Sequence, residues 1–139
     1  PTMAFNDIAI RINAYEQTIK TLGNEKVKGQ PLIRELAIGR TKQEAFEVAR
    51  KPLLAKYESY ATWGQTDTKK ERTLSDTFEE FCRDRFIIGD EQEVVDEILK
   101  YKENFGVDNL LVRVQWPGLG QGEVLKTLDH LGKIIATVS

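Results

Sequence analysis

The chain has 139 residues, of which 40% are hydrophobic and 30% charged, and its 20 Lys+Arg and 22 Asp+Glu leave a net charge of −2. The apolar fraction excludes a wholly disordered chain, because it is large enough for a packed core. The balanced charge argues against a nucleic-acid-binding surface, and no apolar run approaches the length that spans a bilayer. The single cysteine, Cys82, has no internal disulfide partner, which is typical of a reducing cytoplasm. We therefore expect one globular cytoplasmic domain.

An amphipathic helix followed by a strand is expected at the start of the chain. Apolar residues recur every three or four positions between Phe5 and Leu22, and Gly23 then provides a helix stop. After a short polar stretch, an apolar run at 31–38 ends at Gly39, and its length favours a strand.

The next helix should begin after Thr41 and continue to about Trp63. Thr41 is followed three residues later by Glu44, which is the spacing of a capping box at a helix start. Pro52 lies inside this segment and lacks the backbone donor that a helix interior needs. We therefore expect a kink or a break near Val48.

Three shorter elements are expected in the middle of the chain, after a loop. Residues 64–73 are polar, charged and without periodicity, which is typical of a flexible loop. A short helix is expected at 74–83 and an extended segment at 86–89. A further helix at 91–104 is expected to be capped by Asp90.

The strongest strand pattern of the sequence lies at 109–116, and Pro117 and Gly118 break it before a last helix. The apolar residues of that helix recur with helical spacing at Val124, Leu125, Leu128, Leu131, Ile134 and Ile135. Helical crossovers between strands make the strands parallel and the connections right-handed, but two parallel strands cannot enclose a core. The fold class is therefore α/β, and we expect one arc of a larger assembly, as a fragment of a longer protein or completed by oligomerisation.

Strand alternation assigns the polar side chains of both strands to one inner face. In the first strand, Leu36 and Ile38 suit the face that helices cover, which leaves Glu35 on the inner face. In the second strand, Arg113 and Gln115 should also point inward. The residues expected to face the covering helices are Leu110, Val112, Val114 and Trp116. Glu35 and Arg113 are therefore expected to meet, either as a structural ion pair or, with Gln115, as the lining of a pocket for a polar ligand.

Glycines and an aromatic residue precede the last helix. Gly118, Gly120 and Gly122 could hold a phosphate through free backbone amides at the helix start, although a turn with a flexible cap is the simpler interpretation. Gly118 and Gly120 remain candidates because loops after the last two strands of (β/α)8 barrels often bind phosphate. Trp116, just before Pro117, is the aromatic residue best placed for a cofactor or substrate, and packing against a helix is an equal alternative.

The single histidine and the single cysteine give no sign of reactive chemistry. His130 lies near the polar edge of the last helix and has no partner at metal-ligand spacing, so we expect a solvated or capping residue and no metal site. Cys82 follows Phe81 on the short helix and is expected to be a packing residue, since a nucleophilic cysteine needs a base beside it.

Four segments in a fixed order carry a resemblance to a known family. They are 31–38 with the Thr-led helix that follows, the aromatic helix end at 57–64, the segment 85–94, and the segment 106–118. In this order and spacing they resemble the C-terminal part of the bacterial luciferase-like, flavin-dependent monooxygenases. Residues 6–23 then suit the sixth helix of that family's barrel.

The resemblance implies a (β/α)8 TIM barrel of which this chain supplies the last two βα units. It implies an oxidoreductase in which reduced FMN and O2 oxygenate a small-molecule substrate, although some relatives use a deazaflavin for hydride transfer. The sequence departs from the family at Asp90 and Glu91, where Ser or Thr followed by Pro is usual. Because earlier strands supply most flavin contacts in the family, we expect these residues alone to lack a complete active site and to bind no FMN, and we assign no catalytic residue.

A second interpretation uses the same elements without flavin. A small non-catalytic α/β module would self-associate through the open edges of its strands. Both interpretations predict a homo-oligomer or another protein partner, and neither involves nucleic acid or a membrane.

Overall fold

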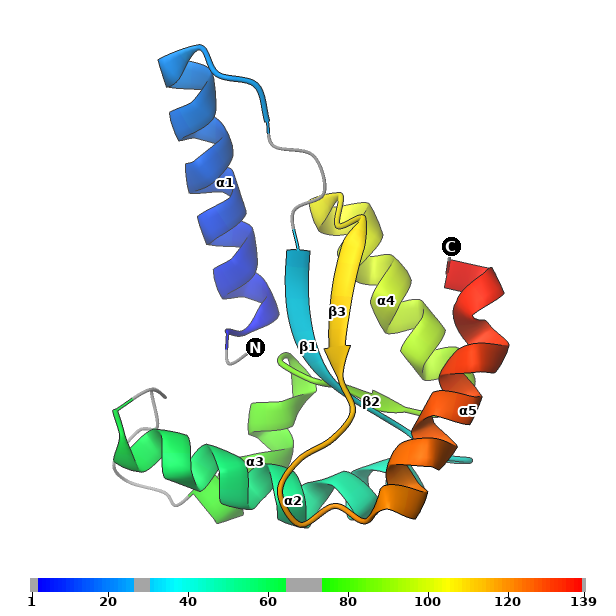
Figure 1. Ribbon diagram of the computed structural model, residues 1–139. Helices are drawn as coiled ribbons and strands as arrows, with labels where there is room; N and C mark the ends of the chain where they lie inside the picture. Colours follow the sequence, from blue (N-terminus) through cyan, green and yellow to red (C-terminus); the bar gives the residue numbers. More distant parts are fainter. Residues whose placement is uncertain (1–2, 27–30, 65–73, 139) are drawn as a thin grey trace.

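The computed structural model describes residues 3–26, 31–64 and 74–138, and in this part of the chain single helices separate the strands, except for two consecutive helices after the first strand (Figure 1). The helices are α1 (Phe5–Leu22), α2 (Lys42–Thr62), α3 (Leu74–Arg83), α4 (Glu91–Phe105) and α5 (Gln121–Val138). The strands are β1 (Pro31–Ile38), β2 (Ile87–Gly89) and β3 (Asn109–Arg113). The loop expected at 64–73 lies, beyond its first residue, outside the described residues.

The sheet is parallel and has β1 at its centre, in the order β2-β1-β3. β3 pairs with the first five residues of β1, at 31–35, and β2 pairs with the last three, at 36–38. The expected parallel α/β architecture is confirmed. The extended segment at 86–89 contributes a third strand, which the sequence pattern alone did not show.

β3 ends at Arg113, three residues before the strand end that the sequence predicts. Arg113 is opposite Glu35 in the register, and residues 114–116 leave the ladder beyond that point. This departure brings the buried Trp116 to the same face as Glu35. The expectation that Trp116 faces the covering helices is therefore wrong, because side chains alternate regularly only as long as the strand continues.

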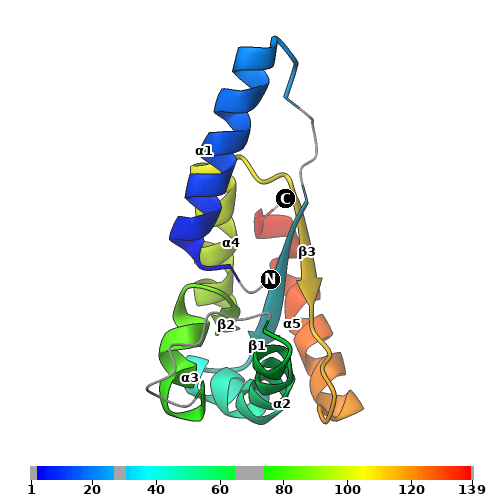
Figure 2. The ribbon, with the colours of Figure 1, turned by 90° about the vertical axis from the view of Figure 1, so that its left-hand side faces the viewer.

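The helices form two groups around the sheet (Figures 1 and 2). α1, α4 and α5 share one core with Leu36 and Ile38, on the outer face of β1. α2 and α3 lie beyond the carboxyl ends of the strands and share a second core with Ala37 and Trp116. The helix that connects β2 to β3 along the outer face is therefore α4. The α2–α3 pair instead covers the end of the sheet.

The sequence predicts a kink or a break near Val48, and the break does not occur, because α2 is one uninterrupted helix with Pro52 inside it. Pro52 is buried, and so are Ala49 and Leu53 on either side of it. Packing of both halves against the same core holds the helix together across the hydrogen bond that proline cannot make.

The two capped helices differ in how completely their capping boxes form. Thr41 accepts a hydrogen bond from the Glu44 backbone N–H at 3.2 Å, but the Glu44 carboxylate accepts from the Arg40 N–H instead of the Thr41 N–H. At α4, Asp90 and Glu93 form both hydrogen bonds of the box, so the predicted cap is confirmed. The extra bond at Arg40 ties the loop after β1 to α2.

α5 presents a different face to the core from the one that its apolar spacing predicts. Val124, Thr127 and Ile134 are buried, whereas Leu125, Leu128 and Ile135 are exposed. The expected stripe is therefore divided between the core and the surface. None of the helices in the described ranges is long and apolar enough to cross a bilayer.

Candidate functional site

The inner face of β1 and β3 carries a charged cluster beside two exposed apolar side chains. Leu36 and its outer neighbours pack under the helices, so Ile33 and Glu35 point to the other face. The register places Leu111 opposite Ile33 and Arg113 opposite Glu35. Ile33 is 39% exposed and Leu111 is 43% exposed, whereas Glu35 is fully buried. The inner face is thus open and apolar at one end, and charged and covered at the other.

Glu35 lies at the centre of the cluster. Its Oε1 accepts hydrogen bonds from Lys56 Nζ at 2.6 Å and from Tyr57 Oη at 2.9 Å, and it lies 3.1 Å from Arg113 Nη2. Its Oε2 accepts a hydrogen bond from Trp116 Nε1. The structure therefore brings together Glu35, Arg113 and Trp116 of the sequence candidates, and the expected contact of Glu35 with Arg113 is confirmed.

Two of the donors come from α2, a helix that the sequence does not place near Glu35. Lys56 and Tyr57 are consecutive residues of α2, and both reach Glu35 because α2 passes across the ends of the strands. Two cations and two neutral donors stabilise the buried carboxylate. Because most of its lone pairs accept these hydrogen bonds, Glu35 is suited to positioning its neighbours and poorly suited to abstracting a proton.

Tyr57 acts as a hydrogen-bond donor in this cluster. Burial, followed by the negative charge of Glu35, raises the pKa of Tyr57 above its ordinary value of 10.0. The phenol is therefore protonated at neutral pH and donates its hydrogen to the carboxylate. Neither Tyr57 nor Lys56 was a site candidate from the sequence, because their role depends on the direction of α2, for which no local signal exists.

Arg113 connects the covered end of the inner face to its open end. Its side chain is 39% exposed, although one of its nitrogens contacts buried Glu35. Its Nε is shielded from solvent and has no hydrogen-bond partner among the described residues. Gln115 lies past the end of β3 and is exposed. The structure thus leaves Gln115 at the surface while it holds Arg113 at the edge of the cluster.

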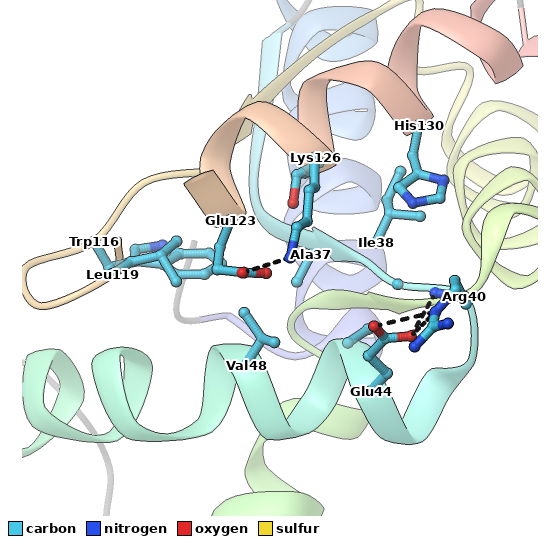
Figure 3. Close-up of a pocket in the computed structure, with 13 residues that line it drawn as sticks. Ala37, Ile38, Arg40, Glu44, Val48, Trp116, Leu119, Glu123, Lys126 and His130 are labelled. Carbon is cyan, nitrogen blue, oxygen red and sulfur yellow. Dashed lines mark hydrogen bonds and ion pairs between the residues drawn. The ribbon is translucent and has the colours of Figure 1, made fainter. Parts of the chain in front are cut away.

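A pocket of about 280 Å³ opens beside the cluster, between α2 and α5 (Figure 3). Trp116 and Leu119 line it from the loop after β3, and Arg40 lines it from the loop after β1. Lys126 and His130 line it from α5. The indole of Trp116 is therefore shared between this pocket and the Glu35 cluster.

Each basic side chain of this pocket contacts a carboxylate. The pairs are Arg40–Glu44 at 3.0 Å, Lys126–Glu123 at 2.8 Å and His130–Glu91 at 2.6 Å. The lining combines apolar side chains with the two ion pairs of Arg40 and Lys126, so its charge is balanced and it does not favour an anion. Gly118 and Gly120 flank Leu119 without lining the pocket, and the positive φ of 86° at Gly118 is typical of a turn.

The single histidine and the single cysteine both contribute to the packing of the fold. His130 joins α5 to α4 through its hydrogen bond with Glu91, and this bond is the main cause that lowers the pKa of Glu91. Cys82 is buried in the second core, and burial raises the pKa of its thiol to about 12. Within the described ranges, no group of three or more His, Cys, Asp or Glu side chains could hold a metal ion.

Comparisons with solved structures identify the fold. Monooxygenase RslO1 from Streptomyces bottropensis superposes on 96% of this chain with a TM-score of 0.75 and 12% identity. The oxygenating constituent of 3,6-diketocamphane monooxygenase from Pseudomonas putida, a type II Baeyer-Villiger monooxygenase in complex with FMN, superposes on 96% of the chain with a TM-score of 0.66 and 15% identity. No family model matches the sequence, and neither does any curated protein.

The chain spans 39% and 40% of the lengths of these two proteins. Its parallel sheet and helices therefore match part of the barrel of luciferase-like monooxygenases, as the sequence resemblance predicts. At 12% and 15% identity the likeness identifies the fold alone.

Proposed function

We propose that this chain forms the last two βα units of a luciferase-like, flavin-dependent monooxygenase, which uses reduced FMN and O2 to oxygenate a small organic substrate. The observation that carries the proposal is the likeness over 96% of the chain to two monooxygenases, one of them in complex with FMN. In barrels of this class the chemistry takes place at the carboxyl ends of the strands. Arg113 and Trp116 of the Glu35 cluster lie at and just beyond the carboxyl end of β3.

The inner face has the chemistry expected of one wall of a flavin site. Ile33 and Leu111 offer exposed apolar surface to a ring system or a substrate. Arg113 offers N–H donors to a polar or anionic edge, and Glu35 holds its guanidinium in place. Bound FMN would supply the activation of O2, and these side chains would orient the bound molecules and exclude water. A closed barrel has eight strands, so we infer that further strands, from more chain or from other copies, complete the site.

The proposal is tested on the natural protein that carries residues 1–139, at the length at which it is expressed. The protein is supplied with FMN, NADH, a flavin reductase and 18O2, and is offered a panel of ketones and aldehydes. One 18O atom in the product, with the second in water, is the expected result, and mass spectrometry detects it. Reduced deazaflavin under anaerobic conditions is the comparison reaction.

Two outcomes would contradict the proposal. The first is a product that carries no 18O although the protein is folded and reduced FMN is present. The second is reduction of a substrate by the deazaflavin without O2, which would assign hydride transfer in place of oxygenation.

A further inference from the structure

We propose that the pocket between α2 and α5 binds a small zwitterion with an apolar body, of the chemical class of an aromatic amino acid. The pocket has a volume of about 280 Å³. Sites for drug-sized ligands measure roughly 300–1,000 Å³, so this pocket suits a single amino acid better than a nucleotide or a peptide. The inference does not rest on the proposed function, because such binding requires neither flavin nor O2.

The pocket persists when further strands join the sheet. β1 and β3 pair directly with each other, so no further strand can come between them. The described lining residues belong to the end of β1, to α2 and to the loops and the helix that follow these two strands. Ile38 of the outer face lines the pocket, whereas Ile33 and Arg113 of the inner face do not. The pocket is therefore a feature of this chain and not of the inner face that other strands would enclose.

The charges around the pocket are balanced and come from both helices. Arg40 pairs with Glu44 at 3.0 Å, and Lys126 pairs with Glu123 at 2.8 Å. The charge of Lys126 also acts on Glu44 across the gap between the helices, and after the hydrogen bonds from Arg40 it contributes to lowering the pKa of Glu44. A lone anion or a lone cation would upset this balance, whereas a zwitterion brings one charge of each sign.

Both ion pairs are open to exchange with a ligand. The Arg40 side chain is 84% exposed and the Lys126 side chain is 66% exposed. Ion pairs in such surroundings contribute little to stability, because water screens them and they restrict long side chains. The carboxylate of a ligand can therefore accept hydrogen bonds from Arg40 or Lys126, while its ammonium group donates to Glu44 or Glu123.

Thr127 offers a further polar group on the same wall. It lines the pocket from α5 and is only 6% exposed. Among the described residues its hydroxyl has no hydrogen-bond partner. Buried polar groups in folded proteins are normally paired. A threonine hydroxyl can donate to a carboxylate or accept from an ammonium group, so a zwitterion in the pocket would supply the partner.

The apolar body of the ligand has a surface at the end of the pocket away from Arg40. Figure 3 shows Trp116 and Leu119 at one end and Arg40 with Glu44 at the other. Trp116 is buried, and its hydrogen bond to Glu35 already fixes the indole. An aromatic ring packed beside an indole gains an interaction beyond the burial of apolar area. The pocket therefore fits a ligand with charges at one end and a ring at the other.

The experiment compares probes that differ in one group, by isothermal titration calorimetry on the natural protein that carries these residues. L-Phenylalanine carries both charges and the ring. 3-Phenylpropionate lacks the ammonium group, 2-phenylethylamine lacks the carboxylate, and glycine lacks the ring. We expect L-phenylalanine to bind about fivefold more tightly than each of the other three.

Variants of the pocket locate the bound ligand. Arg40→Gln and Lys126→Gln should each weaken the binding of L-phenylalanine about fivefold and leave that of 2-phenylethylamine unweakened, because only the former carries a carboxylate. Lys133→Gln is the matched control, since Lys133 is an exposed lysine of α5 that also contacts a carboxylate but does not line the pocket. It should leave the affinity unchanged. Because all three side chains are exposed, the variants should fold, and circular dichroism checks this.

Three results would overturn the proposal. The first is an affinity for 3-phenylpropionate, 2-phenylethylamine or inorganic phosphate that equals or exceeds the affinity for L-phenylalanine. The second is an unchanged affinity for L-phenylalanine in both Arg40→Gln and Lys126→Gln, and the third is the absence of binding at millimolar L-phenylalanine. Because the titration contains no flavin and no O2, such a failure is distinguishable from a negative oxygenation assay.

Discussion

Trp116 Nε1 donates a hydrogen bond to Glu35 Oε2, and this contact ties the loop after β3 to the buried middle of β1. Both residues are buried, so water cannot replace either partner. A hydrogen bond to a charged group contributes more to stability than one between neutral groups. The contact therefore fixes the path of the chain between β3 and α5, and with it one end of the neighbouring pocket.

Trp116→Phe should lower the free energy of unfolding by about 2 kcal/mol, because it removes a donor from a buried carboxylate and keeps an aromatic ring. Urea denaturation followed by circular dichroism measures the change. Trp63→Phe is the matched control, because Trp63 is 67% exposed, and it should change the stability by less than about 0.5 kcal/mol. Equal stabilities of the two variants would argue against a stabilising role for the Glu35 hydrogen bond.

Glu35→Leu should destabilise the chain by about 3–5 kcal/mol, because Lys56 and Arg113 then lose the anion that they share. Lys56→Met in the same chain should recover part of this loss, since it removes the more deeply buried cation. A double-mutant cycle measured by urea denaturation gives the coupling energy. Strictly additive effects of the two substitutions would show that Glu35 and Lys56 are not coupled.

The stability of the α4–α5 contact should depend on pH through Glu91. The hydrogen bond from His130, followed by the nearby positive charge of Lys133, lowers the pKa of Glu91 below its ordinary value of 4.5. A carboxyl group whose pKa is lowered in the folded state stabilises the fold at pH values above its ordinary pKa. This stabilisation is lost as the pH falls through the folded-state pKa. Thermal unfolding between pH 6 and about pH 3 should therefore show a steeper decline in the wild type than in Glu91→Gln. Glu123→Gln, on the same pair of helices, is the control, and identical curves for the wild type and Glu91→Gln would contradict the prediction.

Cys82 should resist thiol reagents in the folded chain. Burial raises the pKa of this thiol to about 12, so almost none is present as the reactive thiolate at pH 8. Reaction with 5,5′-dithiobis(2-nitrobenzoate), followed by absorbance, should be slow in buffer and fast in denaturing urea. A native rate close to the rate in urea would indicate that α3 opens readily or that Cys82 is accessible.

Gly39→Ala should destabilise the chain by about 1–3 kcal/mol. An added Cβ would lie 2.7 Å from the Ala45 backbone nitrogen, and backbone cannot move aside as a flexible side chain does. Gly120→Ala is the matched control, because a Cβ there meets nothing within 4 Å. Unfolding in urea compares the two, and a smaller effect at Gly39 than at Gly120 would contradict the packing at the end of β1.

The individual elements could be predicted where their signals are local. Phe5 to Leu22 repeats apolar residues with the helical period before a glycine, and Asp90 with Glu93 forms the predicted start of α4. β1 also has the predicted bounds. The pairing of Glu35 with Arg113 followed from alternation alone, because both residues lie within regular, adjacent strands.

The positions of elements relative to one another could not be predicted in this way. Lys56 and Tyr57 reach Glu35 only because α2 crosses the ends of the strands, and no spacing within residues 42–62 encodes that direction. Trp116 changes face because β3 ends early, and the apolar sequence gives no stop at Arg113. Pro52 does not break α2 for a related reason, since the packing of buried residues on both sides of it compensates for the missing donor.

The way in which β1 divides its hydrogen bonds has a consequence for how the sheet can grow. Its first five residues pair on one side with β3 and its last three pair on the other side with β2. An additional strand that pairs with residues 31–35 of β1, on the side away from β3, would end where β2 begins. It would therefore displace no existing hydrogen bond of the sheet. Another could join the outer edge of β3 in the same manner. Strands could therefore be added at both edges of the sheet, and the Glu35 cluster between them would not be disturbed.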